Sequence, residues 1–340
     1  MEQEGEKMSS HQSYDLKQMQ SVPLEGKIIM TKERIRQWYE HWDGMVYVSF
    51  SGGKDSTVLK HIVDSMYDDV PAVFVNTGLE YPEIQRFAKS QKNVTVIRPD
   101  LRFDEVIKKY GYPVISKEVA DAAHDAKMNI PRGKETVRVR QLKGLTSDKY
   151  DKSKWLFLVD APFDIDNECC YVMKKKPIKQ YNKRTGRKAI IGTMASESRQ
   201  RLINWLRRGC NAFDAKEPTS QPLSFWTEQD ILRYLKKYNV PYCSVYGDIV
   251  YQDADGNKYD EALFDDAPLT TTGCKRTGCI FCMFGCHLEK EPNRFQRLKE
   301  THPKQYNYCI NGGEMVDGKW QPSKEGLGLG HVLDYIGVKY

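Results

Sequence analysis

Several features that would restrict the class of protein are missing from this sequence of 340 residues. It has no apolar run of about 18 residues, the length needed to cross a membrane, and residues 1–30 lack the basic start and apolar middle of a secretory signal. The excess of positive charge is small, because the chain has 52 Lys and Arg and 46 Asp and Glu. A formal net charge of +6 does not by itself indicate nucleic-acid binding. We therefore expect a cytoplasmic protein without a membrane partner.

Cysteine is scarce for a scaffold held by disulfides, with nine residues in the whole chain. A cytoplasmic protein keeps its thiols reduced, so any clustered cysteines point to metal or redox chemistry. Hydrophobic residues make up 40% and charged residues 29%, which is ordinary for a globular protein and excludes a largely disordered chain.

Short apolar runs alternate with stretches of helical periodicity. This alternation predicts an α/β fold, a parallel twisted sheet with helices on both faces. We expect a polar tail at 1–27, a nucleotide-binding α/β domain at 28–245 and a cysteine-rich region at 246–340. The expected strands are Met45–Phe50, Ala72–Val75, Val94–Ile97 and Lys188–Gly192, and the expected helices are Lys32–Trp42, Thr57–Met66, Pro82–Ser90, Glu197–Arg208 and Thr227–Tyr238.

A glycine-rich turn lies between the first expected strand and the helix that follows it. Gly52 and Gly53 let backbone amides approach an anion, and the helix adds unpaired N–H groups and the positive end of its dipole. Lys54 could neutralise phosphate charge, and Asp55 could reach Mg²⁺ or hold the loop. The turn therefore indicates a polyphosphate site, with an ordinary strand-to-helix turn as the alternative.

The segment Ser51–Ser56, SGGKDS, resembles the PP-loop of the adenine nucleotide alpha hydrolase superfamily, and within it the phosphoadenosine or adenosine phosphosulfate reductase family. Asn76–Glu83 and Gly192–Arg201 are similar to two further motifs of that family. The resemblance implies a bound ATP or adenylyl-sulfate with Mg²⁺, phosphates positioned by Lys54 and Asp55, and developing charge stabilised by Arg201. The implied nucleotide-binding residues are Ser49, Phe50, Ser51, Gly52, Gly53, Lys54, Asp55, Ser56, Thr57, Asn76, Thr77, Gly78, Glu80, Gly192, Thr193, Ser198 and Arg201.

The cysteines form two groups, with four of them between Thr272 and Cys286 and an adjacent pair at Cys169 and Cys170. By resemblance to the adenylyl-sulfate reductase branch, Cys169, Cys170, Cys279 and Cys282 would hold one 4Fe-4S cluster, with nearby lysines offsetting its negative charge. The local set Cys274, Cys279, Cys282 and Cys286 could instead bind zinc. The isolated residues Cys210, Cys243 and Cys309 are expected to be buried.

Reductases of this family carry a nucleophilic cysteine in a C-terminal segment resembling E-C-G-L-H, whereas Lys324–His331 contains none. We therefore expect ATP-dependent adenylylation and sulfur transfer. A true sulfonucleotide reductase and a non-catalytic nucleotide or redox sensor stay open as alternatives. A DNA or tRNA sulfur-modification enzyme is a third, suggested by the basic segments Arg132–Lys154 and Lys174–Lys188. Expected partners are an adenine nucleotide, a nucleic-acid or protein sulfur acceptor, and a thioredoxin-like or ferredoxin-like donor.

Overall fold

The structure is a computed structural model that describes residues 11–262 and 267–340. The chain divides into two compact units, each made of separate segments. Unit 1 comprises Met1–Asn76, Tyr81–Ile97 and Lys179–Thr277, and unit 2 comprises Thr77–Glu80, Arg98–Ile178 and Gly278–Tyr340. This division differs from the predicted boundary at 245. Residues 246–277 belong to unit 1 with the glycine-rich loop, and residues 98–178 belong to unit 2. Among the helices of the described residues, none is long and apolar enough to cross a membrane.

Unit 1 is built on a six-stranded sheet with the order β3-β2-β1-β5-β7-β6. All neighbouring strands are parallel except β6, which pairs antiparallel with β7. The strands are β1 (Val46–Ser49), β2 (Ala72–Val75), β3 (Val94–Ile97), β5 (Lys188–Ile191), β6 (Asn211–Ala212) and β7 (Thr219–Ser220). The chain runs from β1 outward to β3 and then returns to the other side of β1, so the strand order reverses between β1 and β5. In sheets of this kind ligands bind at such a reversal, beyond the carboxyl ends of the two strands.

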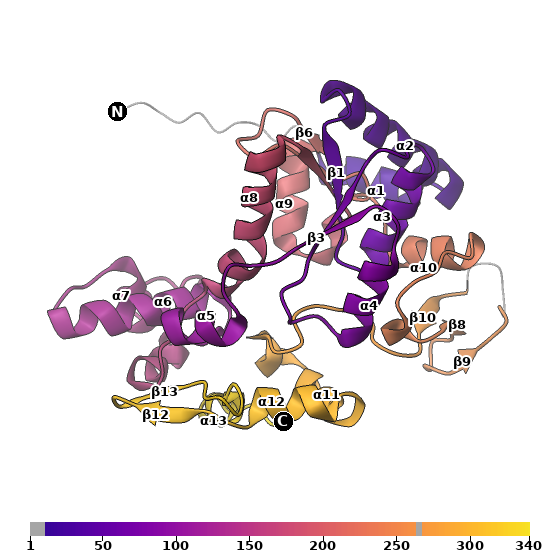
Figure 1. Cartoon of the computed structure of the whole chain (residues 1–340). Coiled ribbons are helices and arrows are strands. Elements are labelled where there is room, and N and C mark those ends of the chain that lie inside the picture. The colour runs from indigo at the N-terminus through magenta and orange to yellow at the C-terminus, as the bar shows by residue number, and fades with distance from the viewer. Residues whose placement is uncertain (1–10, 263–266) are drawn as a thin grey trace, which may run out of the picture. The chain divides into compact units, whose positions relative to one another are not determined.

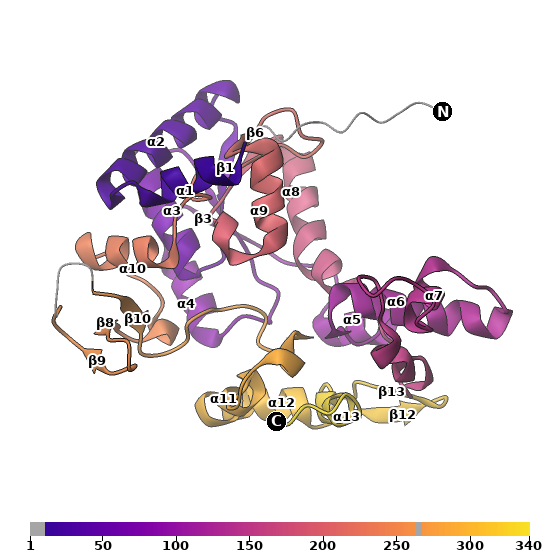
Figure 2. The ribbon, with the colours of Figure 1, turned by 180° about the vertical axis from the view of Figure 1, so that it is seen from behind.

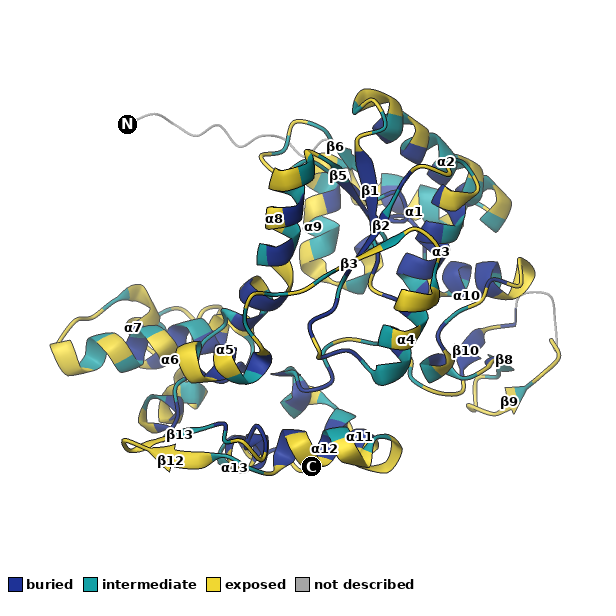
Figure 3. Cartoon of the chain, in the orientation of Figure 1, coloured by how far each residue is buried: buried dark blue, intermediate teal, exposed yellow. Residues whose placement is uncertain are grey.

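Helices cover both faces of this sheet, as Figures 1 and 2 show for α3 on one side and the part of α8 from Lys179 onward on the other. Val46 and Val48 of β1 share a buried cluster with Val58 of α3 (Lys54–Asp64). Tyr47 points to the opposite face, where its ring meets that of Tyr181 in α8 (Lys176–Thr185) at 5.1 Å. Figure 3 shows β1 and β2 as buried strands. The predicted α/β fold is confirmed.

Most of the predicted elements of unit 1 are present with small changes in their ends. The strands at Ala72–Val75 and Val94–Ile97 and the helix α4 (Pro82–Ser90) have the predicted bounds, and Thr227 caps α10 (Glu228–Lys237) through Asp230 N. The predicted helix at 197–208 is a short turn, η4 (Ala195–Glu197), followed by α9 (Arg199–Arg208). Three short antiparallel strands, β8 (Ile249–Gln252), β9 (Lys258–Tyr259) and β10 (Leu269–Thr271), form a second sheet in this unit.

The prediction of a loose polar tail at 1–27 is wrong for its described part. Residues 11–27 contain α1 (Ser13–Ser21) and the start of α2 (Leu24–His41), and residues 1–10 lie outside the described residues. Leu16 is buried in the main core cluster. Lys27 is buried too, and its Nζ lies 2.7 Å from Asp230 Oδ2. Tertiary contacts therefore hold a segment whose polar composition gives no helical pattern of its own.

Unit 2 gathers the remaining helices around short strand pairs. Its pair β4 (Val114–Ile115) and β11 (Met283–Phe284) is parallel and joins the cysteine-rich segment to the start of α6. Ile280 N also donates to Leu79 O at 2.8 Å. The other elements are α5 (Phe103–Tyr110), α6 (Lys117–Asn129), η1 (Ile130–Arg132), α7 (Val137–Leu142), η2 (Ser153–Asp160), η3 (Tyr171–Lys175), η6 (Cys286–Leu288), α11 (Arg294–Thr301), α12 (Pro303–Ile310), β12 (Glu314–Val316), β13 (Lys319–Gln321) and α13 (Leu329–Tyr335); the 3-10 turn η5 (Ser244–Tyr246) belongs to unit 1.

Candidate functional site

The loop after β1 has the shape of an anion cradle. Gly52 has a left-handed φ of +72°, and a Cβ there would lie 3.0 Å from Ile84 Cγ2, so the turn requires glycine. Ser56 Oγ accepts from Ser51 N at 3.2 Å and lies 3.0 Å from Ser51 Oγ, which closes the loop over the first turn of α3. The loop therefore presents its backbone at the amino end of an 11-residue helix, where an anion is favoured.

A buried lysine and a partly exposed aspartate lie next to each other at the start of α3. Lys54 is 4% exposed, and its Nζ lies 3.1 Å from Lys275 O, 3.3 Å from Glu228 Oε1 and 3.7 Å from Asp55 Oδ1. Asp55 Oδ1 is itself buried and has no hydrogen-bond partner among the described residues. Burial raises the pKa of Asp55, and the charge of Lys54 opposes that rise. A carboxylate oxygen held in this way beside a phosphate cradle is suited to Mg²⁺.

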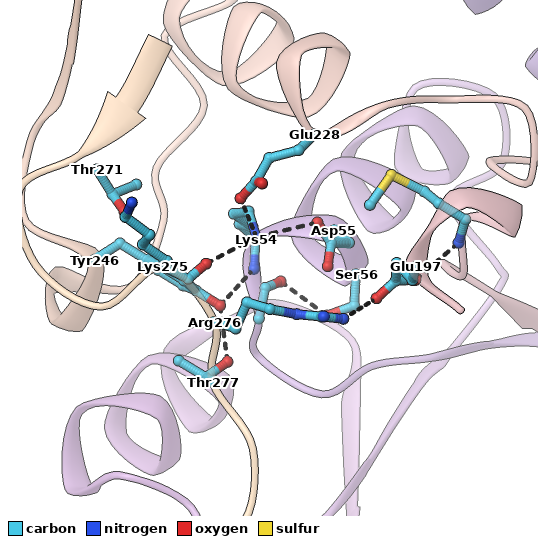
Figure 4. Close-up of polar contacts among 12 residues, drawn as sticks. Lys54, Asp55, Ser56, Glu197, Glu228, Tyr246, Thr271, Lys275, Arg276 and Thr277 are labelled. Atoms are coloured by element: carbon cyan, nitrogen blue, oxygen red, sulfur yellow. Dashed lines mark hydrogen bonds and ion pairs between the residues drawn. The ribbon is translucent and has the colours of Figure 1, made fainter. Parts of the chain in front are cut away.

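Residues far along the chain close over the loop, and sequence reasoning missed them. Tyr246 OH accepts from Lys54 N at 3.1 Å and lies 2.7 Å from Thr277 Oγ1 (Figure 4). Arg276 forms an ion pair with Glu197 at 2.5 Å, and Glu197 also accepts from Met194 N. Lys275, Arg276 and Thr277 lie within the cysteine-rich stretch, and the prediction for that stretch rested on its cysteines alone.

The segment after β5 meets the loop at close range. A Cβ on Gly192 would lie 3.1 Å from Asp55 O, so a glycine allows this approach. Thr193 Oγ1 bonds Gln221 Oε1 at 2.9 Å, and Ser198 Oγ caps α9 by accepting from Arg201 N at 3.3 Å. Arg201 pairs with Glu197; burial lowers its pKa, the charge of Arg276 lowers it further, and Asp55 opposes the fall. Gly192, Ser198 and Arg201 thus belong to the same unit as the loop, and Arg201 and Arg276 share Glu197 as their ion-pair partner.

The remaining predicted nucleotide residues differ in their surroundings. Ser49 ends β1, Phe50 is 2% exposed as part of the core, and Asn76 N donates to Ile97 O at the end of β2. Thr77, Gly78 and Glu80 belong to unit 2, where Glu80 accepts from Thr77 N at 3.1 Å and from Thr77 Oγ1 at 2.7 Å. The role of each as a nucleotide ligand stays a prediction.

Four cysteines from two distant segments line one pocket of unit 2. They are Cys169, Cys170, Cys279 and Cys282, and the other lining residues are Leu79, Phe103, Pro113, Met173 and Lys174. Cys169 Sγ and Cys170 Sγ lie 3.9 Å apart. Within the described residues, no three His, Cys, Asp or Glu side chains are grouped closely enough to hold a metal ion.

The other cysteines have different surroundings. Cys286 Sγ donates to Met283 O at 3.0 Å, and Cys274 belongs to unit 1, where its N donates to Val245 O. The thiols around the pocket are those of the predicted cluster set, which favours that set over the local zinc set. Cys210, Cys243 and Cys309 are buried as predicted.

The four pocket thiols differ in acidity, because the pKa of Cys170 is lowered whereas those of Cys169, Cys279 and Cys282 are raised. The hydrogen bond from Cys169 lowers the pKa of Cys170, burial opposes this, and Lys117 and Lys174 act in the same direction as the hydrogen bond. Burial lowers the pKa of Lys174, but the charges of Cys279 and Glu80 outweigh burial and the pKa is raised. Lys174 also hydrogen-bonds to Cys279, whose pKa burial raises to about 11. A thiolate in this pocket therefore has the ammonium group of Lys174 at hand.

Comparison with known proteins places this site in a family. The chain is 24% identical over 283 residues to the uncharacterized protein MJ0973 of Methanocaldococcus jannaschii, covering 82% of this chain and 50% of the relative. It thus spans about half the length of that relative. It is 24% identical over 214 residues to adenosine 5'-phosphosulfate reductase of Staphylococcus haemolyticus, covering 61% of this chain and 68% of the reductase.

Among solved structures, the phosphoadenylyl-sulfate (PAPS) reductase of Candida auris, in a phosphate complex, is similar with a TM-score of 0.38 and 13% identity, covering 75% of this chain and 100% of the other. The model of the phosphoadenosine phosphosulfate reductase domain matches residues 45–284, which include the loop after β1, the segment after β5 and all four pocket cysteines. The predicted family is confirmed, and the chain belongs to the phosphoadenosine phosphosulfate reductase family.

Proposed function

We propose that the protein is an ATP-dependent enzyme that adenylylates an acceptor and prepares it for sulfur transfer. In this proposal MgATP binds at Ser51–Thr57, and a 4Fe-4S cluster binds in the four-cysteine pocket. The family is one of sulfonucleotide enzymes, so binding of an adenine nucleotide is the part that the family match supports most directly. The choice of reaction depends on the chain's own residues.

The observation that carries the choice is the packing of Gly326. Matching Glu325 to the Glu of E-C-G-L-H puts Gly326 at the cysteine position, whereas matching Gly326 and Leu327 to its Gly-Leu puts Glu325 there. A Cβ on Gly326 would overlap Asn311 O and would lie 2.6 Å from Tyr308 O. The neighbouring Leu327 N donates to Tyr308 O at 2.9 Å. The backbone at Gly326 is therefore packed with no room for a side chain, and neither Glu325 nor Gly326 supplies the thiol that a reductase needs.

Cys309 offers no substitute for that thiol. Its side chain is fully buried, and burial raises its pKa well above the ordinary value of a thiol. A nucleophilic cysteine needs partial exposure and a stabilised thiolate. The reductase reaction therefore lacks a nucleophile in this part of the chain.

The proposed reaction is a transfer of AMP. An oxygen of the acceptor attacks the α-phosphorus of ATP, the bond from that phosphorus to the bridging α,β oxygen breaks, and pyrophosphate leaves as its magnesium complex. Lys54 and the helix amino end hold the phosphate chain, Asp55 Oδ1 is available to the metal, and Arg201 stabilises charge on the phosphates. A hydrosulfide donor then replaces the activated oxygen and AMP is released.

Two sets of residues support the proposed groups, although the side chains as they stand are not gathered tightly enough for a single metal ion within the described residues. Asp55 Oδ1 is buried and has only the ion pair with Lys54 at 3.7 Å, which supports a role in holding Mg²⁺, and four thiols around one pocket with Lys174 near Cys279 support a cluster with cysteine ligands. Cys169, Cys170, Cys279 and Cys282 would hold the cluster. When bound, it would supply an iron site for sulfide.

Product analysis tests the reaction. Anaerobically purified protein is incubated with MgATP, hydrosulfide and a mixture of RNA and DNA, and nucleotides are separated by chromatography. We expect AMP and pyrophosphate, and their loss in Lys54→Ala. In parallel, the protein receives phosphoadenylyl-sulfate and reduced thioredoxin, and sulfite is measured. Sulfite formation, or release of ADP and phosphate instead of AMP and pyrophosphate, would overturn the proposal.

A further inference from the structure

The segment Arg132–Trp155 of unit 2 concentrates positive charge. It contains eight Lys and Arg and three Asp and Glu, a formal +5 in a chain whose total is +6. Seven of the eight basic residues are exposed, and Lys152 is partly exposed. This segment is therefore one of two strongly basic stretches of the chain, the other being Lys174–Lys188 with eight Lys and Arg and no Asp or Glu.

A small hydrophobic cluster holds this segment in place. Val139 and Leu142 of α7 pack on Ala122 and Ala126 of α6, with Trp155 against the same cluster. Both ends of the loop 143–151 are joined through Gln141, whose O accepts from Lys152 N at 2.9 Å and whose Oε1 accepts from Lys152 Nζ at 3.1 Å. Figures 1 and 2 both show α7 at the outer end of unit 2, beyond α5 and α6.

Carboxylates neutralise only part of this charge. Arg138 pairs with Asp121 at 2.6 Å, and Lys143 lies 3.7 Å from Glu135. Asp151 accepts from Ser153 N and Oγ, and the backbone hydrogen bond lowers its pKa. Within the described part of the chain, six basic side chains of the segment form no ion pair: Arg132, Lys134, Arg140, Lys149, Lys152 and Lys154.

Aromatic rings lie between these cations. Tyr150 is 50% exposed and Phe157 is 39% exposed. Lys149 Nζ lies 5.4 Å from the centre of the Tyr150 ring, and Lys154 Nζ lies 5.1 Å from that of Trp155. A ring beside an ammonium group matches one nucleotide of an unpaired strand, whose base stacks while its phosphate is neutralised.

We propose that this surface, Arg132–Phe157, binds an unpaired strand of nucleic acid. A duplex would meet the same cations, but its stacked base pairs would hide the faces that exposed rings contact. Nucleic acid would then be the acceptor that is adenylylated, and this assignment rests on the proposed function. Binding of the strand itself does not require ATP.

Fluorescence anisotropy with a labelled 20-nucleotide strand of mixed sequence tests the proposal, as DNA and as RNA, without ATP. If about five phosphates are neutralised, the log–log salt slope is about −3.5, and affinity falls about 100-fold between 50 and 200 mM salt. Reversal of Lys134, Arg140, Lys149 and Lys154 to Glu should weaken binding at least tenfold and flatten the slope, because each contact contributes about −0.7 to it. Tyr150→Ala should weaken binding about fivefold or more through lost stacking.

The matched control reverses four exposed lysines elsewhere in unit 2, namely Lys290, Lys299, Lys304 and Lys324, for the same change in net charge. We expect it to bind like the wild type. Equal weakening in both quadruple variants, a duplex bound as tightly as the single strand, or no salt-dependent binding would overturn the proposal. Lys54→Ala should bind the strand normally while losing ATP, so a failed adenylylation and a failed nucleic-acid surface give different results.

Discussion

Gly326→Cys tests whether the missing tail cysteine can be restored. The new Cβ would overlap Asn311 O and crowd Tyr308 O, so the backbone must shift. That shift strains two hydrogen bonds of 2.9 Å, from Leu327 N to Tyr308 O and from Gly328 N to Asn311 O. Overpacking costs about 1–3 kcal/mol and a lost hydrogen bond about 1 kcal/mol, so we expect a loss of about 2–4 kcal/mol in the free energy of unfolding.

Urea unfolding followed by tryptophan fluorescence measures this loss, with Gly326→Ala to separate the Cβ from the thiol. Both variants should lose similar stability, because the Cβ causes the overlap. Gly278→Ala is the control, since a Cβ there has nothing within 4 Å and its φ is not left-handed. We also expect no sulfite from Gly326→Cys with phosphoadenylyl-sulfate and thioredoxin. A stable Gly326→Cys variant that produces sulfite would refute the reasoning about this segment.

Three further predictions concern the two sites. Lys54→Ala should weaken ATP binding by about 1.5–3 kcal/mol in calorimetry, because a charged donor to phosphate is removed; unchanged affinity would exclude the loop as the nucleotide site. Asp55→Asn should stabilise the nucleotide-free protein at pH 7, since a raised pKa means that ionised Asp55 destabilises the fold as pH rises past its ordinary value of 3.8. The gain should vanish in urea titrations near pH 3, and a gain equal at both pH values would contradict this cause. Cys170→Ser should abolish anaerobic visible absorbance and bound iron, while Cys274→Ser should leave both; the reverse result would favour zinc at the local cysteine set.

The sequence predicts the parts of the site whose partners are near in the chain. The strand ending at Ser49 and the glycine turn before α3 follow from local pattern, because periodicity and glycine act over a few residues. Contacts across long separations were missed. Tyr246 meets Lys54 across 192 residues, and Lys275 meets it across 221, and no spacing rule connects such positions.

Two other outcomes show the same limit. The cysteine pair and the distant C-x-x-C were joined only through a family resemblance, and the structure brings them to one pocket through pairing of Val114 with Met283 and the bond from Ile280 N to Leu79 O. The helix Ser13–Ser21 has few apolar residues, so periodicity does not predict it. Burial of Leu16 in the core holds this helix in place.

The buried pair of Lys27 and Asp230 sets a limit on where the chain can be shortened for expression. Asp230 Oδ2 accepts from Lys27 Nζ and also from Thr227 N and Oγ1, so one carboxylate serves the cap of α10 and the attachment of α2. Removing residues 1–27 as dispensable would leave that carboxylate buried without its cation, at a cost of about 3–5 kcal/mol. Trp226 Nε1 donates to Thr31 Oγ1 in the same interface, so a chain shortened beyond Thr31 would also lose this contact. A shortened chain that preserves this interface must therefore keep both Lys27 and Thr31.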